Sequence, residues 1–108
     1  MKLEITISSK SGKFEARGIY DGKTVIVQKG GHVNPSFAQS IRGGKMSKKY
    51  REDKKYVSEH YEIIEDCMFK SPSTAAQFVT GRSVDGYNAW KVGSSQCLGE
   101  YLKTKGLR

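Results

Sequence analysis

The sequence lacks the long apolar segments that would place a chain in a membrane. Its apolar runs are only a few residues long, such as Val25–Val27, whereas a membrane-spanning helix needs about 20 apolar residues. The first residues, Met1–Ile7, alternate apolar and polar side chains and contain no apolar core of a signal peptide. We therefore expect a cytoplasmic protein with no membrane partner.

Cysteine is also scarce. The two cysteines, Cys67 and Cys97, cannot build a disulfide framework and have no metal-type spacing, so we expect two reduced thiols. A chain of 108 residues is the length of one domain. Within residues 1–108 we expect a β-meander over 1–30, a basic loop and helix over 31–57, and a strand followed by a motif-bearing region over 58–108.

Signatures of catalysis are missing as well. Gly22-Lys23-Thr24 ends like a phosphate-binding loop, but Arg17 stands where the opening glycine belongs, and the context is strand–turn–strand. His32 and His60 have no partner near them in the sequence that signals a catalytic or metal site. Glu62, Glu65 and Asp66 could bind a metal in principle, but on a strand Glu65 points away from the other two, which favours a solvated edge. We predict that the protein is not an enzyme and has no catalytic residues, no metal and no cofactor.

Basic residues are abundant and unevenly distributed. There are 19 lysines and arginines against 11 acidic residues, a formal net charge of +8. Residues 41–55 hold seven basic and two acidic residues, and residues 56–66 hold four acidic residues and no lysine or arginine. A domain this basic attracts polyanions, nucleic acid above all. The segregation favours a basic patch, and a charge that only keeps the protein in solution is the alternative.

Alternating apolar residues predict an antiparallel meander in the first quarter of the chain. Strands are expected over Leu3–Ile7, Lys13–Tyr20 and Thr24–Gln28. Between the last two, Asp21-Gly22 predicts a type I′ hairpin turn with positive φ at both loop positions. A weaker alternation predicts a fourth strand over His60–Met68.

Helical patterns follow the meander. A short helical turn is expected over residues 37–41 and a helix over Met46–Lys55. Ser47 stands near the start of that helix. Met46, Tyr50 and Val57 are expected to face the core. In the fourth strand, Tyr61 and Ile63 are expected to share one face.

The C-terminal third has clearer helix boundaries. Ser71 is a predicted N-cap, Pro72 suits the first helical position, and Gly81 suits the C-terminal stop. Asp85-Gly86 predicts a tight turn. A last helix, capped by Ser94 or Ser95, is expected to end at Gly106. The fold class predicted is α+β, a small antiparallel sheet of a meander plus a fourth strand, packed with two or three short helices.

Basic and aromatic residues combine into a candidate binding site. Cations bind phosphates, and flat rings stack on exposed bases. The candidate nucleic-acid contacts are Lys45, Lys48, Lys49, Arg51, Lys55, Arg82, Tyr87, Trp90 and Lys91. For the lysines the alternative is a solvated helix face, and for Trp90 it is a place in the core.

The C-terminal third also carries the most specific motif. Phe69–Ala76, Gly81–Ser83 and Asp85–Lys91, followed by Leu98, resemble a family of domains of unknown function, DUF4357. The motif positions are Ser71, Pro72, Ser73, Gly81, Asp85 and Gly86. The resemblance implies a C-terminal module of GIY-YIG nucleases and restriction-type proteins. The motif is also similar to the restriction enzyme adenine methylase associated (RAMA) domain, proposed to read modified DNA.

These observations predict a non-enzymatic nucleic-acid-binding accessory module. Double-stranded DNA is the expected ligand, and modified bases are the finer version of that hypothesis. The resemblance implies a nuclease or methylase encoded elsewhere as the protein partner. The alternative is a protein-interaction module that contacts no DNA and uses a face near Tyr87 and Tyr101.

Overall fold

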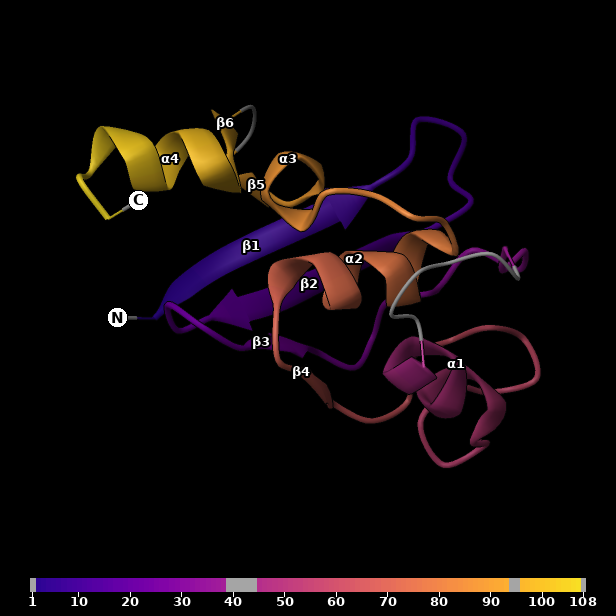
Figure 1. Cartoon of the computed structure of the whole chain (residues 1–108). Coiled ribbons are helices and arrows are strands. Elements are labelled where there is room, and N and C mark those ends of the chain that lie inside the picture. The colour runs from indigo at the N-terminus through magenta and orange to yellow at the C-terminus, as the bar shows by residue number, and fades with distance from the viewer. Residues whose placement is uncertain (1, 39–44, 94–95, 108) are drawn as a thin grey trace.

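The protein, seen in a computed structural model that describes residues 2–38, 45–93 and 96–107, is built on one antiparallel sheet. The strand order is β4-β3-β2-β1-β5-β6, with α2 and α3 over one face (Figure 1). The predicted α+β class is confirmed. The strands are β1 (Leu3–Ser8), β2 (Glu15–Tyr20), β3 (Val25–Val27), β4 (Cys67–Phe69), β5 (Lys91–Val92) and β6 (Gln96–Cys97).

The first three strands form the expected meander. Ile5 and Ile7 on β1 are buried while Glu4 and Thr6 are exposed, as alternation requires of a sheet with one covered face. The register places Ile5 opposite Gly18 of β2. This pairing follows from the apolar pattern, because a slip by one residue would turn the buried set to solvent.

The hairpin between β2 and β3 has a different turn from the predicted one. Its two loop residues are Gly22 and Lys23, because the backbone N–H of Asp21 donates to the carbonyl oxygen of Thr24 at 3.2 Å. Type I′ requires a positive φ at both loop residues. Gly22 has a positive φ of 105° but Lys23 does not, so the turn is not of type I′. Bonds from the Thr24 hydroxyl and from the backbone N–H groups of Thr24 and Lys23 hold the pKa of the Asp21 carboxyl at about 2. Asp21, which precedes the two loop residues, therefore stabilises the turn through its carboxylate.

The predicted fourth strand over His60–Met68 is wrong in extent. Only its C-terminal end pairs as β4, where Ile26 of β3 lies opposite Met68. The preceding residues form a small hairpin joined by an isolated bridge between Val57 and Ile63. Ile63 is buried, but Tyr61 has φ 65° and is 42% exposed, so the two do not share a strand face.

Two further strands were not predicted. β5 pairs with the free edge of β1, opposite Thr6, and β6 pairs with β5. Each is two residues long, too short to show alternation in the sequence. Their pairing depends on the β1 edge, which is distant along the chain.

The first helix in the described ranges differs from its prediction. α1 spans Lys45–Glu52, and Met46 is 45% exposed instead of facing the core. Ser47 is the buried residue of α1, and its hydroxyl donates to the Thr74 carbonyl oxygen at 2.9 Å. Val57 is buried as predicted, although it lies beyond the helix. The other helices are α2 (Pro72–Thr80), α3 (Gly86–Ala89) and α4 (Leu98–Thr104).

The last helix begins later than expected. Cys97 is the N-cap of α4 and makes no side-chain capping bond, while Ser94 and Ser95 lie outside the described residues. Leu98 and Leu102 of this helix are buried. Of the predicted turn over 37–41, residues 39–41 lie outside the described residues, and 37–38 are not helical.

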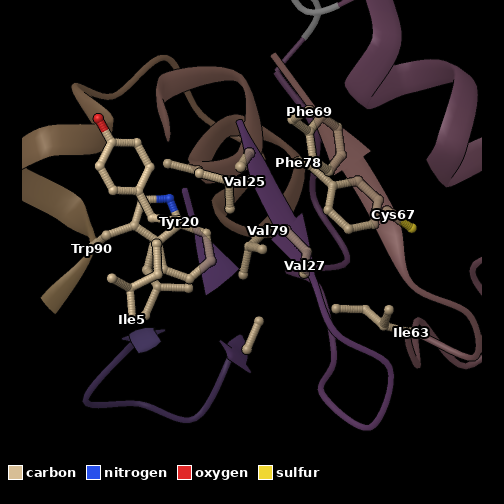
Figure 2. Packing of buried hydrophobic residues seen from close by; sticks show 14 of the residues in the cluster. Ile5, Tyr20, Val25, Val27, Ile63, Cys67, Phe69, Phe78, Val79 and Trp90 are labelled. Carbon is tan, nitrogen blue, oxygen red and sulfur yellow. The ribbon is translucent and has the colours of Figure 1, made fainter. Parts of the chain in front are cut away.

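The core lies between the sheet and α2. Figure 2 shows Trp90 with Tyr20 and Ile5 at one end, and Phe69 with Phe78 at the other. The rings of Phe69 and Phe78 are 5.1 Å apart between centroids. Gly18 is closely packed at the Trp90 end, because a Cβ there would lie 3.2 Å from the Ile26 carbonyl oxygen and 3.3 Å from Cγ1 of Val25.

Candidate nucleic-acid interface

The family-like motif residues start and stop helix α2. The Ser71 side chain accepts a hydrogen bond from the Thr74 backbone N–H at 3.2 Å, which is N-cap geometry. Pro72 occupies the beginning of the helix, as predicted. Gly81 ends it in the left-handed conformation with φ 73°, where its N–H donates to the carbonyl oxygen of Gln77. These residues therefore set the bounds of α2.

The remaining motif residues join α2 to α3. The Ser73 hydroxyl oxygen accepts from the Gly86 backbone N–H at 2.9 Å. A Cβ on Gly86 would overlap the backbone of Pro72 and Ser73, so only glycine fits this approach. Asp85 is the N-cap of α3, and its carboxylate accepts from the Tyr87 N–H at 3.0 Å. The predicted tight turn at Asp85-Gly86 is thus the first turn of a short helix.

Trp90 belongs to the core and not to a binding surface. Its side chain is fully buried, and the indole N–H donates to the Pro72 carbonyl oxygen at 3.0 Å. A buried ring offers no face to a base. The prediction that Trp90 contacts nucleic acid is therefore wrong, and the core alternative holds.

Arg51 was predicted to contact phosphate, but its side chain instead attaches α1 to the rest of the fold. Its guanidinium donates to the Phe78 carbonyl oxygen at 2.8 Å and to that of Asn34 at 2.7 Å. It also lies 4.8 Å from the centre of the Phe37 ring. Burial lowers its pKa to about 10, which still leaves the group charged at neutral pH. The cation is engaged by the last turn of α2 and by the loop at residue 34.

The aromatic residues beside the lysines are similarly engaged inside the protein. The Tyr50 ring packs edge-on against Tyr56, with centroids 4.8 Å apart, and against Phe69 at 5.1 Å. Its hydroxyl oxygen accepts from the Met68 backbone N–H at 3.3 Å. Tyr50 therefore covers the edge of β4 and is not a stacking platform.

The lysines of this segment form the exposed side of α1 and of the turn after it. Ser47, Tyr50 and Arg51 attach α1 to the rest of the fold. We call the exposed basic group the α1 lysine surface; it comprises Lys45, Lys48, Lys49, Lys54 and Lys55. Among the described residues, Lys48 makes the one ion pair of this surface, with Glu52 at 3.9 Å.

The other predicted contacts lie elsewhere. Lys91 is on β5 opposite Thr6, and Thr6 also lies opposite Arg17, so Lys91 and Arg17 belong to one row on the uncovered sheet face. The Lys91 ammonium donates to the Asn88 carbonyl oxygen at 3.2 Å. Figure 1 places β5 and α3 across α2 from α1. The predicted single constellation is therefore divided.

Arg82 and Tyr87 are the remaining predicted contacts, one in the connection after α2 and the other on α3. Arg82 is exposed directly after α2. Tyr87, on α3, is half-buried and lines a shallow hollow with Asp85, Cys97 and Lys103. Arg17 was not among the predicted contacts. The alternation along β2 already indicates that Arg17 is exposed. Its position in one row with Lys91 could not be predicted, because that row depends on the pairing of β5 with β1.

The two cysteines lie on β4 and β6, at opposite edges of the sheet. Burial raises the pKa of the Cys67 thiol to about 12, and the charges of Asp66 and Glu65 add to the effect. Since the thiolate is the reactive form, Cys67 is protonated and unreactive at neutral pH. Within the described ranges no group of three or more His, Cys, Asp and Glu residues is arranged to hold a metal ion.

This environment makes Cys67 a probe of folding. We expect iodoacetamide at mildly alkaline pH to modify the half-buried Cys97 in the native protein and to leave Cys67 unmodified until denaturant is added. Mass spectrometry of proteolytic peptides measures both sites. Modification of both thiols at the same rate without denaturant would contradict the burial of Cys67.

Comparisons with known proteins give a family and no function. A family profile described as a domain of unknown function (DUF4357) matches residues 5–102. No curated protein and no solved structure matches significantly. None of the helices in the described part of the chain has the length and apolar character needed to cross a membrane.

Proposed function

Since this chain belongs to the family of domains of unknown function DUF4357, whose description assigns no activity, we propose from its surface that it is a non-enzymatic nucleic-acid-binding module. The ligand proposed is double-stranded DNA, contacted at its phosphates by the α1 lysine surface. The observation that carries the proposal is the contrast between the two sides of α1. One side is anchored by hydrogen bonds, and the other presents lysines to solvent.

The attachment of α1 is important because a helix fixed to the rest of the fold keeps its lysines close to one another on one surface. Ser47 and Arg51 attach α1 to Thr74 and Phe78, residues of the neighbouring helix α2. On the outer side Lys45 and Lys49 stand one turn apart, about 6 Å along the axis. Their charges reinforce one another, and clustered cations release counterions from DNA when they bind phosphates.

The acidic residues of the segment do little to neutralise this surface. Glu52 pairs with Lys48 at 3.9 Å, and both side chains are more than 60% exposed, so the pair is weak. The Asp53 carboxylate accepts a hydrogen bond from the Lys55 backbone N–H at 2.9 Å and so stabilises the turn after α1. The segment therefore stays strongly positive.

The test is the salt dependence of binding to a labelled duplex, measured by fluorescence anisotropy. With about five phosphate contacts, log K against log salt should have a slope of about −4.5. Replacing Lys45, Lys48 and Lys49 by glutamine should reduce the slope to about −2, because two contacts remain.

A charge-matched control separates a site from overall charge. Lys10, Lys23 and Lys103 are exposed on two hairpin turns and on α4, away from α1. Replacing these three by glutamine removes the same charge and should leave the slope near that of the wild type. Equal losses in both triple variants, or no binding by the wild type at low salt, would refute the proposed surface.

The similarity of the motif to RAMA domains supports a finer version, in which the DNA carries a modified base and the module serves a nuclease or methylase encoded elsewhere. Comparing duplexes with and without N6-methyladenine tests that version.

The proposed location is the cytoplasm. Two free cysteines that lie far apart in the fold accord with a reducing compartment.

One observation favours the protein-interaction alternative. Ile19, Ile26 and Met68 are aligned across β2, β3 and β4 on the sheet face opposite α2. Ile26 is 37% and Met68 58% exposed. Exposed apolar rows of this kind are used in protein contacts. A module that binds a particular protein and ignores DNA at physiological salt would support this alternative.

A further inference from the structure

A tight hairpin over residues 58–62 has a backbone conformation that is rare for its sequence. The Tyr61 N–H donates to the Ser58 carbonyl oxygen at 3.0 Å, and the Ser58 N–H donates to the Glu62 carbonyl oxygen at 2.9 Å. This is the pattern of a short loop closed by a residue in the left-handed region. That position is usually glycine or asparagine. Here it is Tyr61, whose φ of 65° makes it the one non-glycine residue with positive φ in the described ranges.

The turn itself does not require an aromatic ring. Tyr61 contributes backbone bonds, including acceptance from the Val33 N–H at 2.9 Å, and glycine would make these with less strain. The side chain is 42% exposed, so burial does not compensate for the strain as it would in a core residue. Strained residues with exposed functional groups concentrate at binding sites.

Tyr61 borders a hollow whose other lining residues include planar and cationic side chains. Its lining includes Tyr61, His60, His32, Lys13 and the backbone of Gly31. The His32 imidazole is held by a bond of 3.0 Å between Nε2 and the Gly12 carbonyl oxygen. A Cβ on Gly31 would overlap the backbone of Glu15, so this side of the hollow is backbone packed on β2.

The hollow lies beside the end of α1. The Asn34 carbonyl that receives the Arg51 guanidinium belongs to the residue after Val33, which pairs with Tyr61. The hollow therefore adjoins the anchored side of α1, and the lysines lie on the other side of that helix.

We infer that this hollow takes an unpaired nucleobase, stacked on the Tyr61 ring with its neighbouring phosphate near Lys13. The inference rests on the proposed nucleic-acid binding and adds the class of ligand: DNA with an exposed base, single-stranded or extruded from a duplex. Aromatic side chains stack on any base through its π-face. Glu62, exposed on the lining, supplies an acceptor for a base amino group.

The decisive variant is Tyr61→Gly, because it removes the ring and also relieves the backbone strain. We expect the melting temperature to stay the same or rise, while affinity for a single-stranded oligonucleotide falls about tenfold. Affinity for a fully paired duplex should stay within twofold of the wild type. Tyr61→Phe keeps a stacking face at the same φ and should bind both ligands like the wild type. A structural role for the ring would instead lower stability.

A direct probe uses 2-aminopurine as the unpaired base. Its fluorescence should be quenched on binding to the wild type and to Tyr61→Phe, and restored with Tyr61→Gly. Unchanged single-strand affinity and quenching in Tyr61→Gly, with normal duplex binding, would overturn this inference alone. If the wild type binds neither oligonucleotide at low salt, the proposed function itself fails. Loss of stability in Tyr61→Gly, with equal losses for both ligands, would also overturn the inference.

Discussion

Replacing Trp90 by alanine is expected to destabilise the protein by about 4 kcal/mol. The indole is fully buried against Ile5 and Tyr20, so its removal leaves a cavity in the core (Figure 2). It also removes the donor that satisfies the Pro72 carbonyl at the start of α2. Chemical denaturation followed by circular dichroism measures the change in the free energy of unfolding.

A loss this large is a substantial part of the stability of a small domain, so a milder variant is needed beside it. Trp90→Phe keeps most of the ring volume and loses the bond to Pro72, which predicts a cost of about 1–2 kcal/mol. At a temperature where it is folded, this variant should bind duplex DNA like the wild type. Full stability of Trp90→Ala together with lost DNA affinity would contradict the core assignment.

Replacing Arg51 by alanine is expected to cost about 3 kcal/mol, the second largest effect. Hydrogen bonds from a charged donor contribute about 1.5–3 kcal/mol each, with losses that do not add fully. Here the guanidinium donates to Phe78 and Asn34, and it ties α1 to the last turn of α2. A cation at a helix C-terminus is further favoured by the helix dipole. Denaturation curves of the variant measure the loss.

Two matched substitutions make this result specific. Arg51→Lys keeps the charge but cannot reproduce the forked donors, so it should still lose about 1–2 kcal/mol. Lys48→Ala, on the exposed side of the same helix, should change stability by less than about 0.5 kcal/mol. The DNA salt slope should respond in the opposite manner, falling for Lys48→Ala and not for Arg51→Lys. Equal stability losses at the two positions would contradict the anchor.

Where the relevant residues are close together in the chain, the sequence was sufficient. The capping of α2 was predicted because Ser71 bonds the N–H of Thr74, three residues away. The alternation of β1 and the stop at Gly81 were likewise predicted from neighbouring residues. Capping interactions form between residues that are close in the sequence, so the residue pattern is enough to predict them.

The division of the candidate site could not be read in this way. Lys48 and Arg51 are both basic residues of one lysine-rich run, and no local signal distinguishes a phosphate contact from an anchor. The difference arises because Arg51 meets Asn34 and Phe78, which are 17 and 27 residues away in the chain. Likewise, the strands β5 and β6 exist only because the edge of β1 is available to them.

The sequence by itself therefore determined the α+β class, the meander, the bounds of α2 and the excess of positive charge. Only the tertiary structure decided which of the predicted contact residues face solvent. In the folded chain Trp90 is buried, the Arg51 guanidinium is hydrogen-bonded to backbone carbonyls, and Tyr61 is exposed in a strained turn. The physical reason is that capping and alternation depend on adjacent residues, whereas burial and hydrogen-bond partnership depend on segments that meet only in the folded chain.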